Sequence, residues 1–214
     1  MIDSSTYSKY FQALLRGCRR ECTETVSRLV RDGLDVRTLY VDLFQRSLYE
    51  IGDLWEQNRV SVAVEHMATS ITESLFPLVY PTIFSAEHIG KTAVVSCVAN
   101  EYHQIGGKIA ADILELNGWD AYFLGANTPL SDTISLIGSK NADLAGLSLS
   151  LYANLPALLA VIEGIRERFP SLPVIVGGQA FRFGGGEALS RYQGVTLVTS
   201  LAGLEEIAGR ARNA

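Results

Sequence analysis

The spacing of apolar residues changes partway along the chain. From Tyr7 to about Phe84, apolar side chains recur every three or four positions, as on one face of an amphipathic helix. Leu14, Cys18 and Cys22 form one such series. This half of the chain is predicted to be a small bundle of roughly three or four helices.

The pattern after Gly90 is different, because short β-branched runs alternate with longer helical stretches. This alternation is typical of a parallel sheet with helices packed on both faces. The expected strands are Thr92–Cys97, Ala121–Leu124, Leu144–Ser148, Val174–Val176 and Val195–Val198. The expected helices are Ile105–Leu116, Leu130–Gly138, Leu155–Phe169 and Leu201–Arg212. The predicted fold class is therefore α/β, with a helical bundle at residues 1–88, a Rossmann-like doubly wound parallel sheet at residues 89–214 and a linker near residues 85–91.

Composition and charge narrow the function classes. The 214 residues are 48% hydrophobic and carry a formal net charge of -5, with no run of Lys or Arg. Such a surface is not built to neutralise phosphates, so direct nucleic-acid binding is not expected. No apolar stretch approaches the roughly 20 residues that span a bilayer, and the N-terminus lacks a signal-peptide pattern. We therefore expect a cytoplasmic protein with no membrane association.

The three cysteines do not suggest a disulfide framework. Cys18 and Cys22 are four residues apart on a predicted helix, and Cys97 lies in a predicted strand. No nearby histidine or second cysteine pair completes a four-ligand zinc site around Cys18 and Cys22. The cysteines are therefore expected to be structural thiols.

Polar residues cluster in the loop after the first predicted strand. Ligands of an open parallel sheet bind beyond the carboxyl ends of its strands, so chemistry is expected in these loops. This loop contains Asn100, Glu101, Tyr102, His103 and Gln104 in succession. The His103 imidazole can project towards a ligand while Glu101 accepts its other N–H. A carboxylate in that role fixes the tautomer and raises the basicity of a metal-binding imidazole.

Small residues follow the other predicted strands. Gly106 comes just after the His103 loop, and Gly177 and Gly178 follow the fourth strand. Glycines remove side chains where a bulky group lies close to the backbone. Ser148, at the end of the third strand, adds a hydroxyl at the same level. These residues describe a slot rather than a phosphate cradle, and a dinucleotide site is disfavoured because no G-x-G-x-x-G follows the first strand.

Together, these three elements resemble the sequence motif of cobalamin-binding domains. That motif reads Asp-x-His-x-x-Gly, then Ser-x-Leu, then Gly-Gly. The matching residues here are Glu101, His103, Gly106, Ser148, Ser150, Gly177 and Gly178. Two positions depart from the motif, since Glu101 replaces the aspartate and Ser150 replaces the leucine. The resemblance covers most of residues 91–214.

The resemblance implies a bound cobalamin whose own benzimidazole base is displaced from cobalt. His103 is then the lower cobalt ligand, and the nucleotide tail lies in a channel beside Ser148 and the glycine pair. The helical domain is expected to cover the other face of the cofactor. The implied cofactor-binding residues of the α/β domain are Asn100, Glu101, Tyr102, His103, Gln104, Gly106, Ser148, Ser150, Gly177 and Gly178, with His103 as the metal ligand.

The helical half carries a second resemblance. Trp55 ends one predicted helix and Glu65-His66 lie early in the next, so an antiparallel hairpin brings the three to a similar level. The trio resembles the cap domain of the light-sensing, adenosylcobalamin-binding transcriptional regulators of carotenoid synthesis. In that family the tryptophan packs on the upper adenosyl group beside the Glu-His pair, which implies the same role for Trp55, Glu65 and His66. Those regulators commonly have a second histidine after the tryptophan, whereas this chain has Glu56, so a bis-histidine state through that position is excluded.

Three functions fit these residues. The trio favours a sensory or regulatory module, without a recognisable DNA-binding domain, that binds adenosylcobalamin and responds to loss of the upper ligand by light or chemistry. Its output then passes through a partner protein or a change of oligomeric state. The second function is a methyl carrier that uses methylcobalamin and serves partner methyltransferases, and the third is a haem or other tetrapyrrole sensor. Free-standing catalysis is not expected, because no catalytic triad or carboxylate pair has supporting context.

Overall fold

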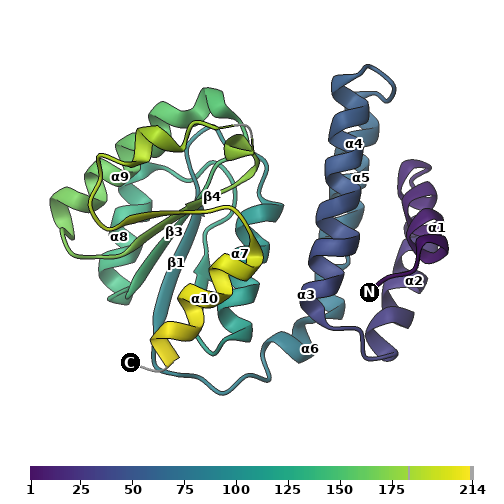
Figure 1. The fold of residues 1–214 in the computed structure, drawn as a ribbon, viewed down its shortest axis with the longest axis horizontal. Helices are drawn as coiled ribbons and strands as arrows, with labels where there is room; N and C mark the ends of the chain where they lie inside the picture. Colours follow the sequence, from purple (N-terminus) through teal and green to yellow (C-terminus); the bar gives the residue numbers. More distant parts are fainter. Residues whose placement is uncertain (183, 213–214) are drawn as a thin grey trace. The chain divides into compact units, whose positions relative to one another are not determined.

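The computed structural model describes residues 1–182 and 184–212. The chain divides into two units, one spanning residues 1–85 and the other beginning at Ala86 (Figure 1). The predicted fold class is confirmed, since the first unit is helical and the second is built on a five-stranded parallel sheet.

The helices of the first unit have apolar residues at helical spacing, and some of them begin at polar N-cap residues. The helices are α1 (Ser4–Leu15), α2 (Arg19–Arg31), α3 (Val36–Thr38), the π-helical η1 (Leu39–Gln45), α4 (Arg46–Glu56), α5 (Val62–Glu73), the 3-10 turn η2 (Phe76–Leu78) and α6 (Tyr80–Ile83). The side chains of Asp3, Asp35 and Ser61 each accept a backbone N–H three residues on, which starts α1, α3 and α5. The segments α3, η1 and α4 follow one another without a break, and α4 forms a helical hairpin with α5 (Figure 1).

An aromatic cluster forms the core of the first unit. Tyr10, Tyr40, Phe44 and Phe76 are all fully buried. The ring centroids of Tyr40 and Phe76 are 5.3 Å apart, and those of Phe44 and Phe76 are 5.6 Å apart. Aromatic pairs at such distances contribute about 0.5–1.5 kcal/mol each beyond the apolar area they bury. The cluster therefore anchors the η1–α4 stretch to α1 and to the segment after α5.

The sheet of the second unit has the strand order β2-β1-β3-β4-β5, with every pair parallel. The strands are β1 (Thr92–Cys97), β2 (Asp120–Phe123), β3 (Leu144–Ser148), β4 (Val174–Gly177) and β5 (Val195–Val198). The predicted strands differ from these by one residue at most. Every residue of β3, and all but the first of β1, is buried, which explains why both read as continuous apolar runs.

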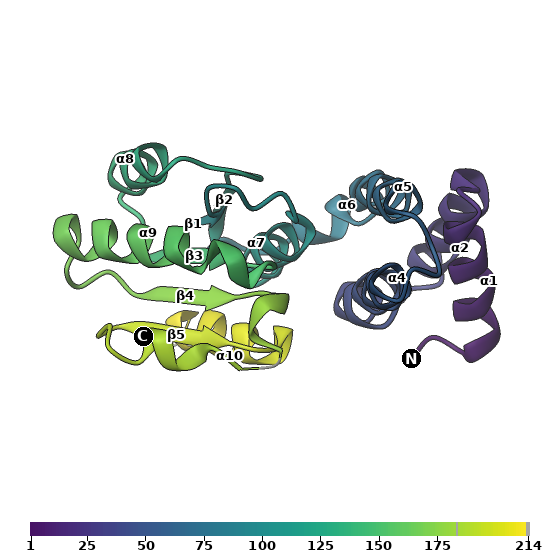
Figure 2. The ribbon, with the colours of Figure 1, turned by 90° about the horizontal axis from the view of Figure 1, so that it is seen from above.

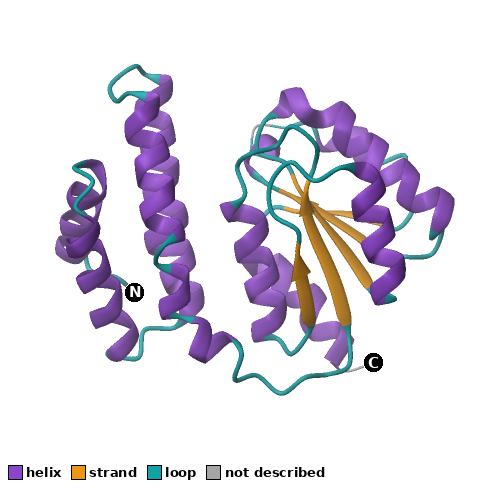
Figure 3. Cartoon of the chain, turned by 180° about the vertical axis from the view of Figure 1, so that it is seen from behind, coloured by secondary structure: helices purple, strands orange, loops and turns teal. Residues whose placement is uncertain are grey.

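Helices cover both faces of the sheet. The long ones are α7 (Ile105–Leu116), α8 (Leu130–Lys140), α9 (Leu155–Arg168) and α10 (Leu201–Arg212), and short 3-10 turns η3 (Tyr152–Asn154), η4 (Gln179–Phe181) and η5 (Gly186–Leu189) follow β3 and β4. Helix α7 packs with α10 on one side, and α8 packs with α9 on the other (Figure 2). The strands point the same way, so their carboxyl ends meet at one edge (Figure 3).

The segment predicted as a linker is held by the second unit. The Ile89 N–H donates to the carbonyl of Gly118 at 2.8 Å, and Nδ1 of His88 lies 2.8 Å from Oδ1 of Asp120. A Cβ on Gly118, whose φ is +86°, would collide with the carbonyl of Glu87. His88 is exposed and is paired with a carboxylate. These contacts explain why the second unit begins a few residues before the predicted boundary.

Within the described part of the chain, no helix combines the length and the apolarity that crossing a membrane requires.

Candidate functional site

The carboxyl edge of the sheet gathers residues that are distant in sequence. In the strand register, Cys97 of β1 lies beside Ser148 of β3, and Ser148 lies beside Gly177 of β4. The chain leaves β1 towards β2 on one side and later continues through β3 to β5 on the other. In doubly wound sheets, ligands bind at such a switch point, outside the carboxyl ends of the two strands. The loops after β1 and β3 therefore border the candidate site.

Glu101 and His103 form a hydrogen-bonded pair in the loop after β1. Nδ1 of His103 lies 2.7 Å from Oε1 of Glu101, and the backbone N–H of His103 donates to the same oxygen at 3.0 Å. The side chain of Glu101 is fully buried, whereas that of His103 is 46% exposed. Because the carboxylate holds Nδ1, a metal at this site would be bound through Nε2.

The second carboxylate oxygen of Glu101 ties the loop after β1 to the loop after β3. Oε2 accepts the backbone N–H groups of Ser150 and Leu151, both at 2.9 Å. Burial raises the pKa of Glu101, but the hydrogen bonds from His103, Leu151 and Ser150 outweigh burial and lower that pKa to about 2. Because this value lies below the ordinary 4.5, the ionised carboxylate stabilises the fold at neutral pH, and its contribution is lost as the pH falls from about 4.5 towards 2.

Two asparagines that the sequence analysis did not single out complete this network. Asn127, after β2, accepts the N–H of Asn100 at 2.8 Å and donates its own N–H to the Glu101 carbonyl at 2.8 Å. Asn154, after β3, donates to the Asn100 carbonyl at 3.1 Å. Asn100 and Asn127 adopt left-handed backbone with φ of +66° and +49°, which asparagine tolerates better than most residues. Asparagines just past strand ends are the sequence signal for such turns.

Adjacent glycines at the start of α7 have different roles. A Cβ on Gly106 would lie 3.7 Å from Oγ of Ser148, which is an ordinary contact, so glycine leaves open space beside the serine. A Cβ on Gly107 would lie 2.9 Å from the Phe123 ring and 3.2 Å from Sγ of Cys97. Gly107, which the sequence analysis did not assign, therefore lets α7 pack closely on the sheet.

The glycine pair after β4 lies close to the backbone of neighbouring segments. Gly178 has a φ of +124°, and a Cβ there would collide with the backbone of Leu149. A Cβ on Gly177 would lie 3.0 Å from the carbonyl oxygen of Val198. The backbone after β3 therefore already requires glycine at position 178, and the predicted role of the pair beside a ligand stays a prediction.

Large exposed side chains lie in the two loops that Glu101 joins. Tyr102 is 68% exposed in the loop after β1, and Leu151 and Tyr152 are 45% and 53% exposed in the segment after β3. Gln104 is the last residue before α7, and the Ser150 N–H bonds to Glu101 as described above. Large apolar side chains gathered at a sheet edge often mark a binding site. This rim suits a ligand with an apolar face.

In the first unit, Trp55, Glu65 and His66 all lie near the turn between α4 and α5. Trp55 is in the last turn of α4 and is 43% exposed, and Glu65 is in the first turn of α5. Nδ1 of His66 lies 2.6 Å from Oε2 of Glu65, and the imidazole of His66 is largely exposed. This end of the hairpin thus presents an aromatic ring and a carboxylate–imidazole pair on its surface.

Two family models match this chain. A model described as a B12 binding domain matches residues 91–204, and a second model with the same description matches residues 7–79. The chain is 25% identical to dimethylamine corrinoid protein 1 of Methanosarcina acetivorans over 171 residues, which are 75% of this chain and 78% of that protein. It is 28% identical to the HTH-type transcriptional repressor CarH of Myxococcus xanthus over 137 residues, which are 63% of this chain and 45% of the repressor.

Solved structures share the fold. The Methanosarcina barkeri monomethylamine corrinoid protein superposes with a TM-score of 0.84 at 12% identity, covering 98% of this chain and 99% of that one. The methanol:cobalamin methyltransferase complex MtaBC of the same organism gives a TM-score of 0.54 at 15% identity, covering 100% of this chain and 81% of that one. At these identities the likeness extends to the fold alone.

Proposed function

The chain belongs to the B12 binding domain family, and from that premise we propose that it holds a cobalamin at the carboxyl edge of its sheet, with His103 as the lower cobalt ligand. One observation carries the proposal. The exposed imidazole of His103 is held at Nδ1 by a fully buried, ionised carboxylate, which is how proteins orient a metal-binding histidine.

The residues at this edge fit such a group. The Glu101–His103 pair offers one imidazole nitrogen as a metal ligand, and a single protein ligand suits a metal whose other ligands come from a macrocycle. Tyr102 and Leu151 offer an apolar rim for a flat ring, and Gly106 leaves open space beside the Ser148 hydroxyl. When bound, a cobalamin supplies cobalt with an upper adenosyl or methyl group that can be released or transferred.

The charge of Glu101 is expected to matter more than its shape. Glu101→Gln keeps the size of the side chain, but it replaces an ionised acceptor of several N–H groups with an amide, which is a weaker partner for the imidazole. We expect cobalamin binding to weaken by about 10- to 100-fold. Titration of the apo protein with cobalamin, followed by absorbance, measures this affinity. Asp143→Asn is the control, since Asp143 also accepts a backbone N–H, from Thr92, but at the opposite end of β1. Equal affinity in the two variants would contradict the role of Glu101.

We further propose that the cobalamin carries an adenosyl group and that the protein is a sensor. The exposed Trp55 offers a stacking surface, and Glu65 and His66 offer hydrogen-bonding groups at the same end of the hairpin. The likeness to the CarH repressor supports this function. The described residues contain no DNA-binding motif that we can identify, so a partner protein or a change of oligomeric state would carry the signal.

A methyl carrier is the second candidate, supported by the likeness to dimethylamine corrinoid protein 1 over 75% of this chain. Its cofactor would be methylcobalamin, and its partners would be methyltransferases. In either case the chain holds a cofactor for a larger system and is not a free-standing enzyme.

Trp55→Ala separates the two functions. A sensor that stacks the adenosyl group on this ring should lose about tenfold or more in affinity for adenosylcobalamin, with little change for methylcobalamin. Phe84→Ala is the control, because Phe84 is also an exposed aromatic residue of the first unit. Binding is measured in the dark, and the size of the wild-type complex is measured before and after green light. Equal effects on both cobalamins, with a size unchanged by light, would favour the methyl carrier.

A further inference from the structure

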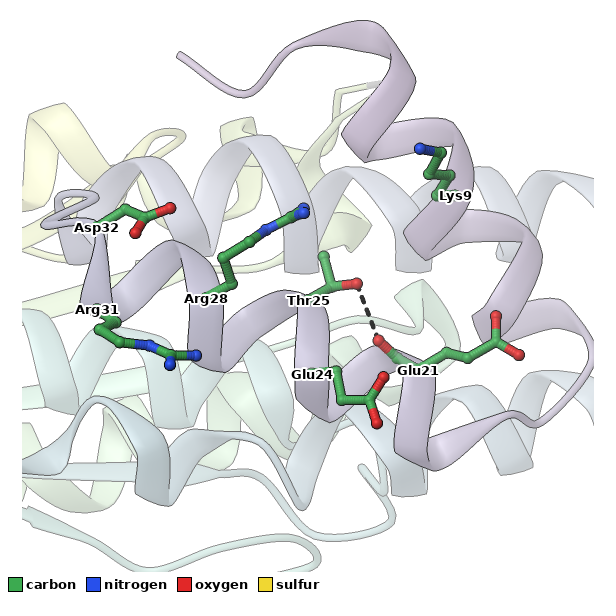
Figure 4. A pocket seen from close by; sticks show the side chains of 7 residues that line it. All are labelled: Lys9, Glu21, Glu24, Thr25, Arg28, Arg31 and Asp32. Carbon is green, nitrogen blue, oxygen red and sulfur yellow. Dashed lines mark hydrogen bonds between the residues drawn. The ribbon is translucent and has the colours of Figure 1, made fainter.

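Helix α2 carries a stripe of charged side chains opposite its buried residues. Cys22 and Val26 are fully buried in the core of the first unit. At 100° per residue, exposed Arg19 in the first turn lies near the buried side, whereas the other five exposed residues of α2 fall within an arc of about 100° on the opposite side of the helix. They are Arg20, Glu21, Glu24, Arg28 and Arg31. An open groove of about 660 Å³, lined by residues of α2 and by Lys9 of α1, follows this side (Figure 4).

The charges along the stripe are ordered. Glu21 and Glu24 stand in the N-terminal half of α2, and Arg28 and Arg31 stand in its C-terminal half (Figure 4). Glu21 and Glu24 make exposed ion pairs with neighbouring arginines of the same chain. In the described part of the chain, neither Arg28 nor Arg31 has an ion-pair partner. The two arginines of the C-terminal half are therefore open to carboxylates of a partner, and Glu21 and Glu24 of the N-terminal half are exposed carboxylates of that kind.

A second α2 running antiparallel meets the stripe with complementary charges. Val26 lies midway between residues 24 and 28, between 21 and 31, and between 20 and 32. When the two antiparallel helices are aligned so that their Val26 residues lie at the same level, Glu24 faces Arg28 of the other copy and Glu21 faces Arg31. Arg20 also faces Asp32, the exposed residue that caps α2.

Other registers lose this match. A shift of one residue breaks all three pairs and sets Arg20 against Arg31 in one direction or Glu21 against Asp32 in the other. A parallel arrangement sets each charge against its own kind. Like charges in such positions oppose association, and no other antiparallel register forms all three pairs, so the order of charges favours this arrangement.

We propose that the charged face of α2 is a self-association surface whose partner is α2 of a second copy of this chain, antiparallel across a twofold axis. Twofold symmetry forms each of the three pairs twice. Exposed ion pairs are individually weak and are screened by salt, so the dimer is weak and salt-dependent. This inference does not depend on cobalamin binding.

Sedimentation velocity of the full apo chain tests the proposal with two single variants. Glu24→Arg makes positions 24 and 28 both basic, and Arg28→Glu makes them both acidic, so each variant repels itself. We expect the wild type to dimerise at about 20 mM salt, and its dissociation constant to rise at least tenfold at about 500 mM. Each variant alone should sediment as a monomer at low salt. An equimolar mixture of the two should recover the dimer, because each basic position then faces an acidic one.

Arg210→Glu is the matched control. It makes the same charge change on α10, where Arg210 pairs with Glu206 four residues away. This variant should dimerise like the wild type. Circular dichroism checks that all variants are folded. A wild type that stays monomeric at low salt, or folded variants that do not associate when mixed, would overturn the proposal.

Discussion

His103→Ala should weaken cobalamin binding by about 10- to 100-fold and change the absorption spectrum of whatever cobalamin remains bound. The reason is that the substitution removes the imidazole that Glu101 orients at the carboxyl edge of the sheet. Without that ligand, the cobalt keeps its own benzimidazole base or takes up water. Absorbance titration of the apo protein with hydroxocobalamin and adenosylcobalamin measures both affinity and spectrum.

His88→Ala provides a closely matched control. His88 is 53% exposed and lies 2.8 Å from an aspartate oxygen, much as His103 is 46% exposed and lies 2.7 Å from a glutamate oxygen. Both residues belong to the second unit, but His88 lies before β1 and His103 after it. His88→Ala should bind cobalamin like the wild type. A His103→Ala protein with unchanged affinity and spectrum would show that His103 is not the ligand.

Gly178→Ala should destabilise the second unit by about 3 kcal/mol or more. The φ of +124° is a conformation that side-chain-bearing residues rarely adopt, and the added Cβ would also collide with the Leu149 backbone. Leu149 and the two residues after it join β3 to the Glu101 network, so the collision would displace the segment that holds this carboxylate. Thermal unfolding of the apo protein measures the loss of stability.

Gly184→Ala separates strain from collision. Gly184 has a similar φ of +119°, but apart from its chain neighbours a Cβ there would meet no atom of the described residues within 4 Å. Gly184→Ala should lower the stability of the second unit by about 1–3 kcal/mol, through backbone strain alone, and leave cobalamin binding close to that of the wild type. If Gly178→Ala were no less stable than Gly184→Ala, the collision with Leu149 would not explain the glycine.

Local patterns were sufficient to predict the fold. The buried strands β1 and β3 are short runs of apolar and small residues bounded by turns, and the helices after them keep a helical apolar period, so both could be delimited from the sequence. The short spacing between Glu101 and His103 likewise predicted a contact that the structure contains. Contacts of this kind join residues only a few positions apart, so the local sequence is enough to predict them.

Contacts between loops could not be predicted in this way. Asn127 and Asn154 join the Glu101 loop from segments 26 and 53 residues further along, and no local period relates them. Gly178 was interpreted as a gap for a ligand because the approach of the Leu149 backbone depends on the pairing of β3 with β4. Tertiary packing, and not local propensity, decides both features.

In the proposed complex a protein histidine, His103, replaces the cobalamin's own base on cobalt. Electron paramagnetic resonance of the reconstituted protein, reduced to the cobalt(II) form, tests this directly when the histidines carry nitrogen-15. One axial nitrogen-14 splits the cobalt lines into triplets, whereas one nitrogen-15 splits them into doublets. We predict doublets from the labelled wild type and their absence from labelled His103→Ala. Triplets from the labelled wild type would mean that the cobalamin base is still bound to cobalt, and would contradict the account.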